Sequence, residues 1–426
     1  MRPFPDSTRI QGGRLEVGGV DLTGMAREHG TPVHVYCLQT LQARAGAYAS
    51  ALSGAGRAVF ACKANGTVEV VRAILAQGLG ADVASEGELA AALRAGAAPE
   101  WLVVHGNNKS DRDVEAALDA AAGLVVLDHP EEAAQVERLA ASAGRVQQVL
   151  LRVTPGIVAD THRKIVTGHD DSKFGMAPPA VLDLLDEIAG MPYLQPAGLH
   201  VHLGSQISDL GAFRAAAAWL AGFVDDHGLG DLPLLDLGGG LAIPYLEDDD
   251  PPTVETAVAA TLDAVVTAFL GRGLPLPQLI LEPGRSIAGP AGVTLYTVGA
   301  IKTSAAGTIY AAVDGGMSDN PRPALYGARY TAAVSDRADA PGEARYTIAG
   351  KHCESGDILI EGIRLPQLRP GDVLAVPATG AYSASMASTY NALPRPAAVM
   401  VEAGAARLIV RRETVGELLA RDLESA

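Results

Sequence analysis

Lys63 is the side chain whose position in this sequence most directly suggests chemistry. It follows a short apolar run, residues 58–62, with the composition of a buried strand. A lysine at the end of a buried strand is desolvated, which favours the neutral amine over the ammonium ion. A neutral amine is the form that attacks an aldehyde to give a Schiff base. A structural lysine in a salt bridge is the alternative, and position alone leaves both open.

Gly238, Gly239 and Gly240 form a turn directly after an apolar run that ends at Leu237. Glycines let backbone N–H groups approach an anion closely, so such a turn can bind a phosphate. The Gly-Lys-Ser/Thr sequence of a P-loop is missing here. Glycine turns without a ligand are common, so this turn alone leaves phosphate binding open.

Glu282 ends another apolar run and is followed by Pro283, Gly284 and Arg285. A carboxylate held against a pyridine nitrogen keeps that nitrogen protonated and makes the ring an electron sink. An arginine in that place would leave the ring a poorer sink, so the acid favours decarboxylation over racemisation. A buried ion pair between Glu282 and Arg285 is the structural alternative.

His200 and His202 are two residues apart in an apolar run, and hence lie on one face of an expected strand. A zinc site would need further ligands, and no third histidine, cysteine or aspartate has suitable spacing. We therefore expect no metal, and we expect either a ring stacked on a flat cofactor or a core histidine.

Two side chains in the last third of the chain are further candidates. Cys353 is flanked by Lys351, His352 and Glu354, a polar setting that suits a titrating thiol, although a lone cysteine is more often a small buried hydrophobe. Arg322 lies in a polar loop and can grip a carboxylate bidentately, or it is a surface arginine. We expect residues 248–252 to be a solvated loop without chemistry.

Strand-like runs alternate with Ala/Leu/Glu-rich helical segments between about residues 55 and 290. Their continuous apolarity is typical of parallel strands buried on both faces. Eight such repeats predict an α/β fold of the (β/α)8 TIM-barrel type, with its chemistry at the C-terminal strand ends. An open doubly wound sheet is the competing arrangement. The eight runs are residues 58–62, 81–84, 102–105, 124–127, 149–153, 197–203, 234–237 and 279–282.

From about residue 291 the pattern changes to strands separated by Gly, Pro and Asp turns, which predicts a mostly β C-terminal domain. We expect residues 36–290 to form the barrel, residues 291–426 the β domain, and N-terminal strands in residues 1–35 to complete that domain. The expected strands are residues 14–17, 33–36, 293–300, 309–313, 345–349, 358–363, 373–376, 397–401 and 407–410.

Composition excludes several classes of protein. The chain has 426 residues, 48% of them hydrophobic and 19% charged, with a net charge of −16. This acidic balance gives no basic surface for nucleic acid or for an anionic membrane. No apolar run approaches the ~20 residues that span a bilayer. Three scattered cysteines do not make a disulfide framework, so we expect a cytoplasmic protein.

Taken together, these segments resemble the pyridoxal-phosphate-dependent decarboxylases of the alanine-racemase-like fold, and within them the diaminopimelate decarboxylase family. The resemblance extends over essentially the whole chain, and several motifs in the right order are far more specific than any one. The motifs are Cys62-Lys63-Ala64-Asn65, His105-Gly106-Asn107-Asn108-Lys109-Ser110, Asp171-Ser172-Lys173-Phe174-Gly175, Gly198-Leu199-His200-Val201-His202-Leu203-Gly204-Ser205-Gln206, Asp236-Leu237-Gly238-Gly239-Gly240, Glu282-Pro283-Gly284-Arg285, Cys353-Glu354-Ser355-Gly356-Asp357 and Thr379-Gly380-Ala381-Tyr382.

The resemblance implies that pyridoxal 5'-phosphate is the cofactor and that Lys63 holds it through a Schiff base. It implies that His202 stacks on the cofactor ring and that Tyr382 contacts cofactor and substrate. Further residues are implied to hold the phosphate and the ring nitrogen, with the glutamate on the nitrogen: Ser205, Gly238, Gly239, Gly240, Glu282, Pro283, Gly284 and Arg285.

The resemblance also implies how an amino-acid substrate is bound. Arg285, Arg322 and Tyr326 would take its distal carboxylate, and Glu354 its distal ammonium group. Cys353 would be the proton donor. In the family this cysteine and the glutamate after it reach into the partner's barrel, which implies a homodimer with shared active sites.

The implied reaction is decarboxylation of meso-2,6-diaminopimelate to L-lysine and CO2, the last step of lysine biosynthesis. A related decarboxylase of ornithine, lysine or arginine is one alternative, but those substrates end in a cation and need acids where Arg322 and Tyr326 stand. An amino-acid racemase is a second, which Glu282 disfavours. A non-catalytic relative is a third, and it would be expected to lack Lys63 or Cys353.

Overall fold

The computed structural model describes residues 1–156 and 172–423, and the chain divides into two compact units. The barrel unit consists of Arg44–Ala242 and Pro251–Ser286. The β unit consists of Met1–Ala43, Ile243–Asp250 and Ile287–Ala426. Among the helices of the described residues, none is both long and apolar enough to cross a membrane.

In the described part of the barrel unit, eight parallel strands close on themselves in the order β10-β11-β12-β5-β6-β7-β8-β9. From β5 to β12, each strand pairs with the next one along the chain, and β12 pairs with β5 to close the ring. The strands are β5 (Gly56–Ala61), β6 (Gly80–Val83), β7 (Leu102–Val104), β8 (Leu124–Leu127), β9 (Gln147–Arg152), β10 (Leu194–His200), β11 (Leu234–Asp236) and β12 (Gln278–Leu281).

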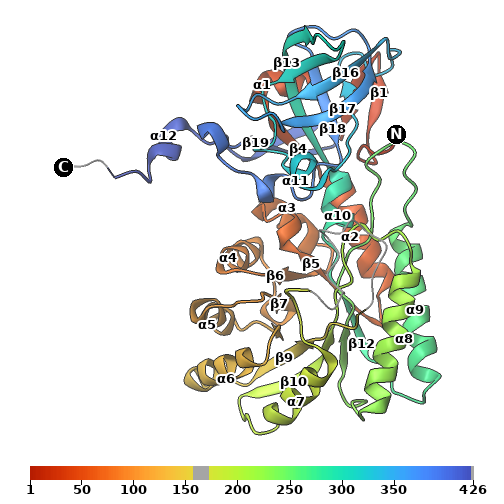
Figure 1. Cartoon of the computed structure of the whole chain (residues 1–426), viewed down its shortest axis with the longest axis vertical. Helices are drawn as coiled ribbons and strands as arrows, with labels where there is room; N and C mark the ends of the chain where they lie inside the picture. The colour runs from red at the N-terminus through yellow and green to blue at the C-terminus, as the bar shows by residue number, and fades with distance from the viewer. Residues whose placement is uncertain (157–171, 424–426) are drawn as a thin grey trace. The chain divides into compact units, whose positions relative to one another are not determined.

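Helix α2 precedes β5, and an α-helix follows each strand from β5 to β11 along the chain; Figure 1 shows those labelled α4, α5 and α6 on the outside of the strands. Local sequence sets their ends. Ser85 caps α4 by accepting the Glu88 N–H, and Gly96 ends it at a φ of 97°. Ser110 and Asp113 form a capping box on α5. The helices are α2 (Leu38–Ala51), α3 (Val68–Leu75), α4 (Glu86–Ala95), α5 (Asp111–Asp119), α6 (Glu131–Ala143), α7 (Pro178–Ile188), α8 (Gly211–Asp226) and α9 (Val254–Leu270).

The interior of the barrel is a packed core that fixes the strand positions. Side chains from most of the eight strands meet there, as in other parallel barrels of this size. Because each strand is locked to two neighbours, the residues just beyond the strand ends are held at fixed places around the mouth. The core residues are Val59, Val103, Leu124, Val126, Leu150, Ala197 and Ile280, with Leu234 packed against them.

The predicted barrel is confirmed, and the open doubly wound sheet is excluded by the pairing of β12 with β5. Individual strand ends differ from the sequence pattern by a few residues. The largest difference is at β10, which starts at Leu194 and ends at His200 rather than running from 197 to 203. The apolar run continues past the strand because Val201 and Leu203 are buried outside it.

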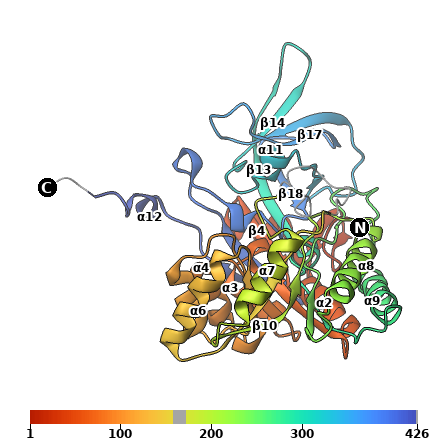
Figure 2. The same cartoon turned by 60° about the horizontal axis from the view of Figure 1, so that its bottom comes forward.

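The β unit is built on a sheet in which strands from both ends of the chain pair directly. β4 lies between β13 and β19, and β13 forms with β14 the long hairpin seen in Figure 2. The predicted completion of this domain by an N-terminal strand is therefore confirmed. The strands are β4 (Val33–Cys37), β13 (Gly292–Thr303), β14 (Ile309–Val313), β15 (Ala333–Val334), β16 (Ala344–Ala349), β17 (Ile358–Leu365), β18 (Val373–Pro377), β19 (Ala397–Glu402) and β20 (Ala405–Val410).

A second, small antiparallel sheet precedes this one in the β unit. Asp21 then caps the helix that follows by accepting the N–H groups of Thr23 and Gly24. The elements are β1 (Arg9–Gln11), β2 (Arg14–Val17), β3 (Val20–Asp21) and α1 (Leu22–His29), and the short helices further along the chain are α10 (Arg285–Ala288), α11 (Arg322–Tyr326) and α12 (Val415–Leu419).

His34 is a titratable group buried inside the β sheet. It lies on β4, and its Nδ1 is 3.0 Å from the Thr294 hydroxyl on β13. Burial, with a smaller contribution from the charge of Arg412, lowers the pKa of His34 from 6.5 to about 4. The folded protein therefore keeps this ring neutral at a pH where the unfolded chain protonates it.

Replacing His34 with Gln is expected to flatten the acid side of the stability profile. As pH falls from 6.5 towards 4, the unfolded chain takes up a proton that the folded protein excludes, so stability is lost. The wild type should lose about 3 kcal/mol more than H34Q over this interval. Urea unfolding of both proteins at several pH values measures the difference. Parallel profiles would contradict this account of His34.

Candidate active site

Lys63 lies in a 3-10 turn, Cys62–Ala64, immediately beyond β5. Its Nζ is 3.6 Å from Oδ2 of Asp82, which lies on the neighbouring strand β6. The side chain of Lys63 is 45% exposed, so the desolvation expected from its strand-end position is wrong for the side chain as it lies here. Instead, a buried carboxylate stands next to an amine that opens towards the barrel mouth.

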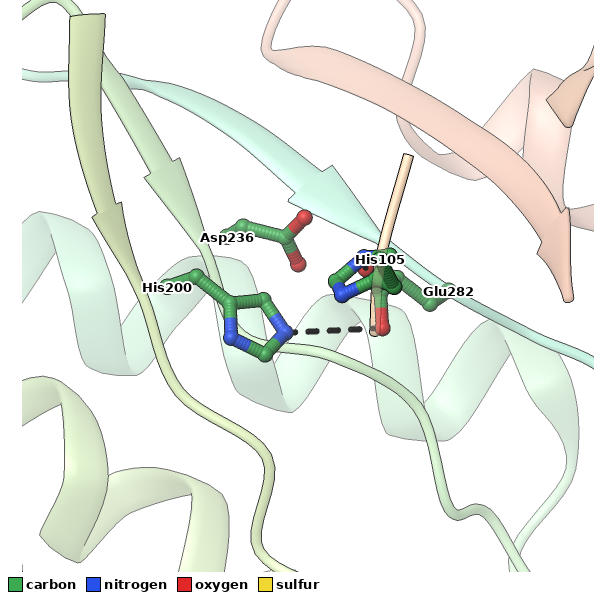
Figure 3. Close-up of side chains that lie close together, drawn as sticks. All are labelled: His105, His200, Asp236 and Glu282. Atoms are coloured by element: carbon green, nitrogen blue, oxygen red, sulfur yellow. Dashed lines mark hydrogen bonds and ion pairs between the residues drawn. The ribbon is translucent and has the colours of Figure 1, made fainter. Parts of the chain in front are cut away.

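Glu282 follows β12 and is the centre of a buried polar cluster at the mouth. Its Oε1 is 2.5 Å from Nε2 of His105, and its Oε2 is 3.5 Å from Nε2 of His200. Figure 3 shows the two imidazoles and the Asp236 carboxyl group gathered around Glu282. His105 follows β7, and His200 and Asp236 are the last residues of β10 and β11. Four separate strand ends therefore supply this cluster.

Burial and electrostatic interactions within the cluster shift the pKa values of Glu282 and Asp236 in opposite directions. Burial alone raises the pKa of Glu282, but the charge and the hydrogen bond of His105, with a further contribution from His200, outweigh it and hold that pKa well below its ordinary value. Burial and the neighbouring charge of Glu282 raise the pKa of Asp236 well above its ordinary value. Burial lowers the pKa of His200 to about 3. Glu282 is therefore the ionised acid of the pair.

The side-chain types of this cluster are also those that zinc accepts, and the ligand atoms of the four residues lie within 4.8 Å of one another. Ligand atoms on a tetrahedral zinc ion are about 3.3 Å apart, given Zn–N and Zn–O bonds of about 2.0 Å. The 2.5 Å between His105 Nε2 and Glu282 Oε1 is instead that of a strong hydrogen bond. The cluster is a hydrogen-bond network in this structure.

The glycine turn after β11 packs against the Glu282 segment. Glu282 donates its N–H to the Gly238 carbonyl, and Gly239 donates its N–H to Nδ1 of His202 at 3.4 Å. A Cβ on Gly239 would come within 2.1 Å of the Glu282 carbonyl oxygen, and Gly240 has a φ of 112°. Only glycine fits this approach of two backbone segments.

Arg285 and Ser205 meet beside this turn, because Nη2 of Arg285 donates to the Ser205 hydroxyl at 2.8 Å. The intervening segment is also fixed: the Pro283 carbonyl accepts the Ala61 N–H, and a Cβ on Gly284 would come within 2.9 Å of the Ala64 side chain. The structure thus joins the Glu282 segment to the Lys63 segment. The Arg285 guanidinium, the Ser205 hydroxyl and the N–H groups of the glycine turn are donors of the kind that bind a phosphate.

One further barrel motif is the segment 171–175, and its first residue, Asp171, lies outside the described residues. Gly175 is described, and it donates its N–H to the buried Asp128 at 3.1 Å. Arg152 places its guanidinium 4.6 Å from the centre of the Phe174 ring. This segment is therefore tied to the ends of β8 and β9.

In the β unit, Arg322 begins α11 and is held by two tyrosine rings. Its Nη1 donates to the Tyr330 hydroxyl at 2.6 Å, and its Cζ lies 4.6 Å from the centre of the Tyr245 ring. The two rings meet edge to face at 5.2 Å. Arg322 is buried, so the surface-arginine alternative is excluded. Tyr326 ends the same helix and is half-buried.

Residues 248–252 lie outside helices and strands, as expected of a loop, and within them Asp249 has a structural contact. Its Oδ2 accepts the N–H groups of Tyr245 and Leu246 at 2.8 and 2.9 Å. The segment Ile243–Asp250 belongs to the β unit, although it lies between β11 and α9 in the sequence. Asp249 therefore holds the tyrosine that packs on Arg322.

Cys353 and Glu354 lie in an exposed turn of the β unit. The Cys353 N–H donates to the Asn391 side chain at 2.8 Å. His352 anchors the turn, since its Nδ1 is 2.7 Å from Asp357 and its ring stacks on Tyr390. The thiol is exposed, so the alternative of a buried hydrophobic cysteine is excluded.

Tyr382 has a φ of 58°, which is unusual for a residue with a bulky side chain. It follows the tight segment in which a Cβ on Gly380 would come within 1.8 Å of the Ala288 carbonyl oxygen. Strained backbone of this kind persists where its surroundings enforce it, and it is concentrated at functional sites.

The barrel brings together every candidate that the sequence placed in it, from Lys63 to Arg285. The candidates on the β unit fall into the Arg322 cluster, the Cys353 turn and the Tyr382 turn. Sequence reasoning missed Asp82, Tyr245 and Tyr330, and it quoted His105 and Asp236 within motifs without giving either a role. The signal for the barrel members was an acid or imidazole inside or next to an apolar run.

Comparison with known proteins agrees with this site. Residues 38–289 match the family model described as the pyridoxal-dependent decarboxylase, pyridoxal binding domain. The diaminopimelate decarboxylases of Mycobacterium leprae and Bacillus subtilis are 44% and 42% identical to this chain. Both alignments cover 98% of this chain, and they cover 91% and 97% of the respective relatives. The crystal structure of the M. jannaschii diaminopimelate decarboxylase in complex with L-lysine is 31% identical, with a TM-score of 0.91, over 99% of this chain and 98% of that one.

Proposed function

We propose, from the premise that this chain belongs to the diaminopimelate decarboxylase family of pyridoxal-dependent decarboxylases, that it converts meso-2,6-diaminopimelate to L-lysine and CO2. This carboxy-lyase reaction is the last step of lysine biosynthesis. The observation that carries the proposal is the buried Glu282 at the mouth of the barrel, with Nε2 of His105 at 2.5 Å and Nε2 of His200 at 3.5 Å from its carboxyl oxygens.

The residues at the barrel mouth fit pyridoxal phosphate. A half-exposed lysine lies on one side, and on another a glycine turn approached by Arg285 and Ser205 offers donors for a phosphate. Glu282 supplies an anion for the ring nitrogen, with His202 beside the turn. When bound, the pyridine ring withdraws electrons from the carbon that loses CO2.

The side chains of this chain then divide the work. Lys63 would hold the cofactor through its aldehyde, with the Asp82 carboxylate 3.6 Å from the lysine amine. Glu282 would hold a proton on the ring nitrogen, and His202 and Tyr382 would position the ring. Cys353, whose thiol is exposed, would be the proton donor.

Substrate choice follows from the distal end. Arg322 is pre-positioned by Tyr330 and Tyr245, and with Tyr326 and Arg285 it would bind the distal carboxylate, while Glu354 would bind the distal ammonium group. A substrate that ends in a cation alone would leave a buried arginine unpaired and be rejected. This disfavours ornithine, lysine and arginine as substrates, and the acid at Glu282 disfavours racemisation.

The active unit that we propose is a homodimer in which Cys353 and Glu354 act at the partner's barrel. Both side chains are exposed in their own chain. In Figures 1 and 2, α12 stands away from the sheet of its own unit, and its apolar residues Val415 and Leu419 are exposed. Residues 36–290 would bind the cofactor, and residues 1–35 and 291–426 would supply the substrate and partner contacts. The exposed catalytic thiol suits the reducing cytoplasm.

The purified protein with pyridoxal phosphate is expected to release CO2 and lysine from meso-diaminopimelate. Lys63→Ala should abolish lysine formation and the visible absorbance of bound cofactor, because the amine that binds the aldehyde is lost. Lys302→Ala, on the exposed face of β13, is the matched control. Turnover of ornithine without turnover of meso-diaminopimelate would refute the proposed substrate.

Tyr330→Phe is expected to raise the KM for meso-diaminopimelate about tenfold and to leave kcat within about twofold, since it removes a hydrogen bond to a charged group that binds substrate. Tyr310→Phe on β14 is the control. Steady-state kinetics separate the two constants, and a fall in kcat with unchanged KM would argue against Arg322 at the distal carboxylate.

Mixing equal amounts of Lys63→Ala and Cys353→Ala protein should restore about a quarter of wild-type activity, because about half of all dimers would be mixed and each of these would carry one intact site out of two. Each variant alone should be inactive. Subunit exchange followed by a lysine assay measures the recovery. No recovery, with exchange verified by differently tagged chains, would contradict shared active sites.

A further inference from the structure

Asp236 is a buried carboxyl group in which one oxygen has no hydrogen-bond partner. It is the last residue of β11 and is fully buried. Its Oδ1 accepts the Gly238 N–H at 2.8 Å. Its Oδ2 is buried without a hydrogen-bond partner, and one carboxyl oxygen of Asp236 lies within 4.8 Å of a ring nitrogen of His105, a ring nitrogen of His200 and an oxygen of Glu282. A buried oxygen in this state is costly unless it carries or receives a proton.

A carboxyl oxygen of Glu282 and one of Asp236 lie within 4.8 Å of each other, so ionising both groups would carry a large electrostatic penalty. They extend from neighbouring strand ends, and a third carboxyl group, Asp82, faces them from β6. Two carboxylates in a water-excluded site share a proton, as in other paired acids. The question is which of the pair carries it.

Hydrogen-bond donors decide that question. Glu282 has the His105 imidazole at 2.5 Å and Nε2 of His200 3.5 Å away, close enough to donate after a small movement, whereas Asp236 has a single backbone N–H on its other oxygen. The ionised form belongs where donors converge, and the protonated form where they are missing. The Nζ of Lys63 lies 3.6 Å from Oδ2 of Asp82, so its charge acts mainly on that carboxyl group.

We propose that Asp236 keeps its proton at neutral pH and donates Oδ2–H to the Glu282 carboxylate, as a positioning residue that holds Glu282 ionised and oriented. Burial and the charge of Glu282 raise the pKa of Asp236 in the direction that this requires. Its effect on the cofactor rests on the proposed function, since Glu282 would then present its carboxylate to the ring nitrogen in one fixed orientation.

Two variants separate a proton donor from a charge. Asp236→Asn keeps both contacts, because its Oδ1 can accept the Gly238 N–H and its Nδ2 can donate to Glu282. Asp236→Leu keeps the branching and the number of side-chain heavy atoms but has no donor, and circular dichroism of the purified variant checks that the larger methyl groups leave it folded. If Asp236 is protonated, the dissociation constant for pyridoxal phosphate should stay within about threefold of wild type in D236N and rise at least tenfold in D236L. Equal weakening in both would overturn the proposal.

The proton itself is measured in the full chain without cofactor. Because burial raises the pKa of Asp319 to about 7, the readout is a difference spectrum: the C=O stretch of a protonated carboxyl group should appear at pH 7.5 in wild type minus D236N and be missing from wild type minus Asp183→Asn, which changes an exposed acid on α7. Absence of that difference band would overturn the proposal, and so would absence of any such band in the wild type, even if D236N failed to fold. Because no activity enters this measurement, it stands apart from failure of the proposed decarboxylation.

A stability profile gives a third readout. The folded protein holds a proton that the unfolded chain releases, so raising the pH from 5 to 8 should destabilise the wild type relative to D236N. The ratio of their unfolding equilibrium constants should rise about tenfold per pH unit while Asp236 stays protonated. The groups that face Asp236 and remain in both proteins are Glu282, Asp82, His105 and His200. A ratio independent of pH would contradict the proposal.

Discussion

Glu282 has lost its hydration shell beyond the end of β12, and an ionised carboxylate buried without donors would cost several kcal/mol. Its donors come from β7 and β10, which are far from β12 in the sequence and also lie elsewhere in the ring. Only closure of the barrel makes them converge on one point. The packed interior therefore serves the chemistry, because it fixes the strand ends from which this network is built.

The same interaction explains why the neighbouring backbone has so little freedom. The Glu282 N–H binds the Gly238 carbonyl, and its own carbonyl leaves no space for a side chain on Gly239. One residue is thus held by its side chain and by its main chain. An enzyme that needs an acid in a fixed orientation gains this from pre-organisation rather than from movement during the reaction.

Sequence patterns predicted the architecture because parallel strands buried on both faces have a distinctive composition. The strand run 124–127 was predicted to the residue, whereas β10 ended three residues early because buried apolar side chains continue past it. Asp82 was missed, and Asp236 was given no role, because the apolar pattern that predicts a buried strand does not say what a single acid within it does. Tyr245 was missed for another reason: nothing local shows that residues 243–250 belong to the second unit. Lys63 was located correctly, but its exposure depends on neighbours that the sequence does not place.

The position of β4 has a consequence for how the chain is made. β4 ends at Cys37, and its two sheet partners begin at Gly292 and Ala397. At ordinary rates of translation, the first of these partners leaves the ribosome roughly ten to fifty seconds after β4. During that interval β4 is an unpaired apolar strand, while the barrel between them can already close. The cell must therefore shield this edge until the last quarter of the protein has been synthesised.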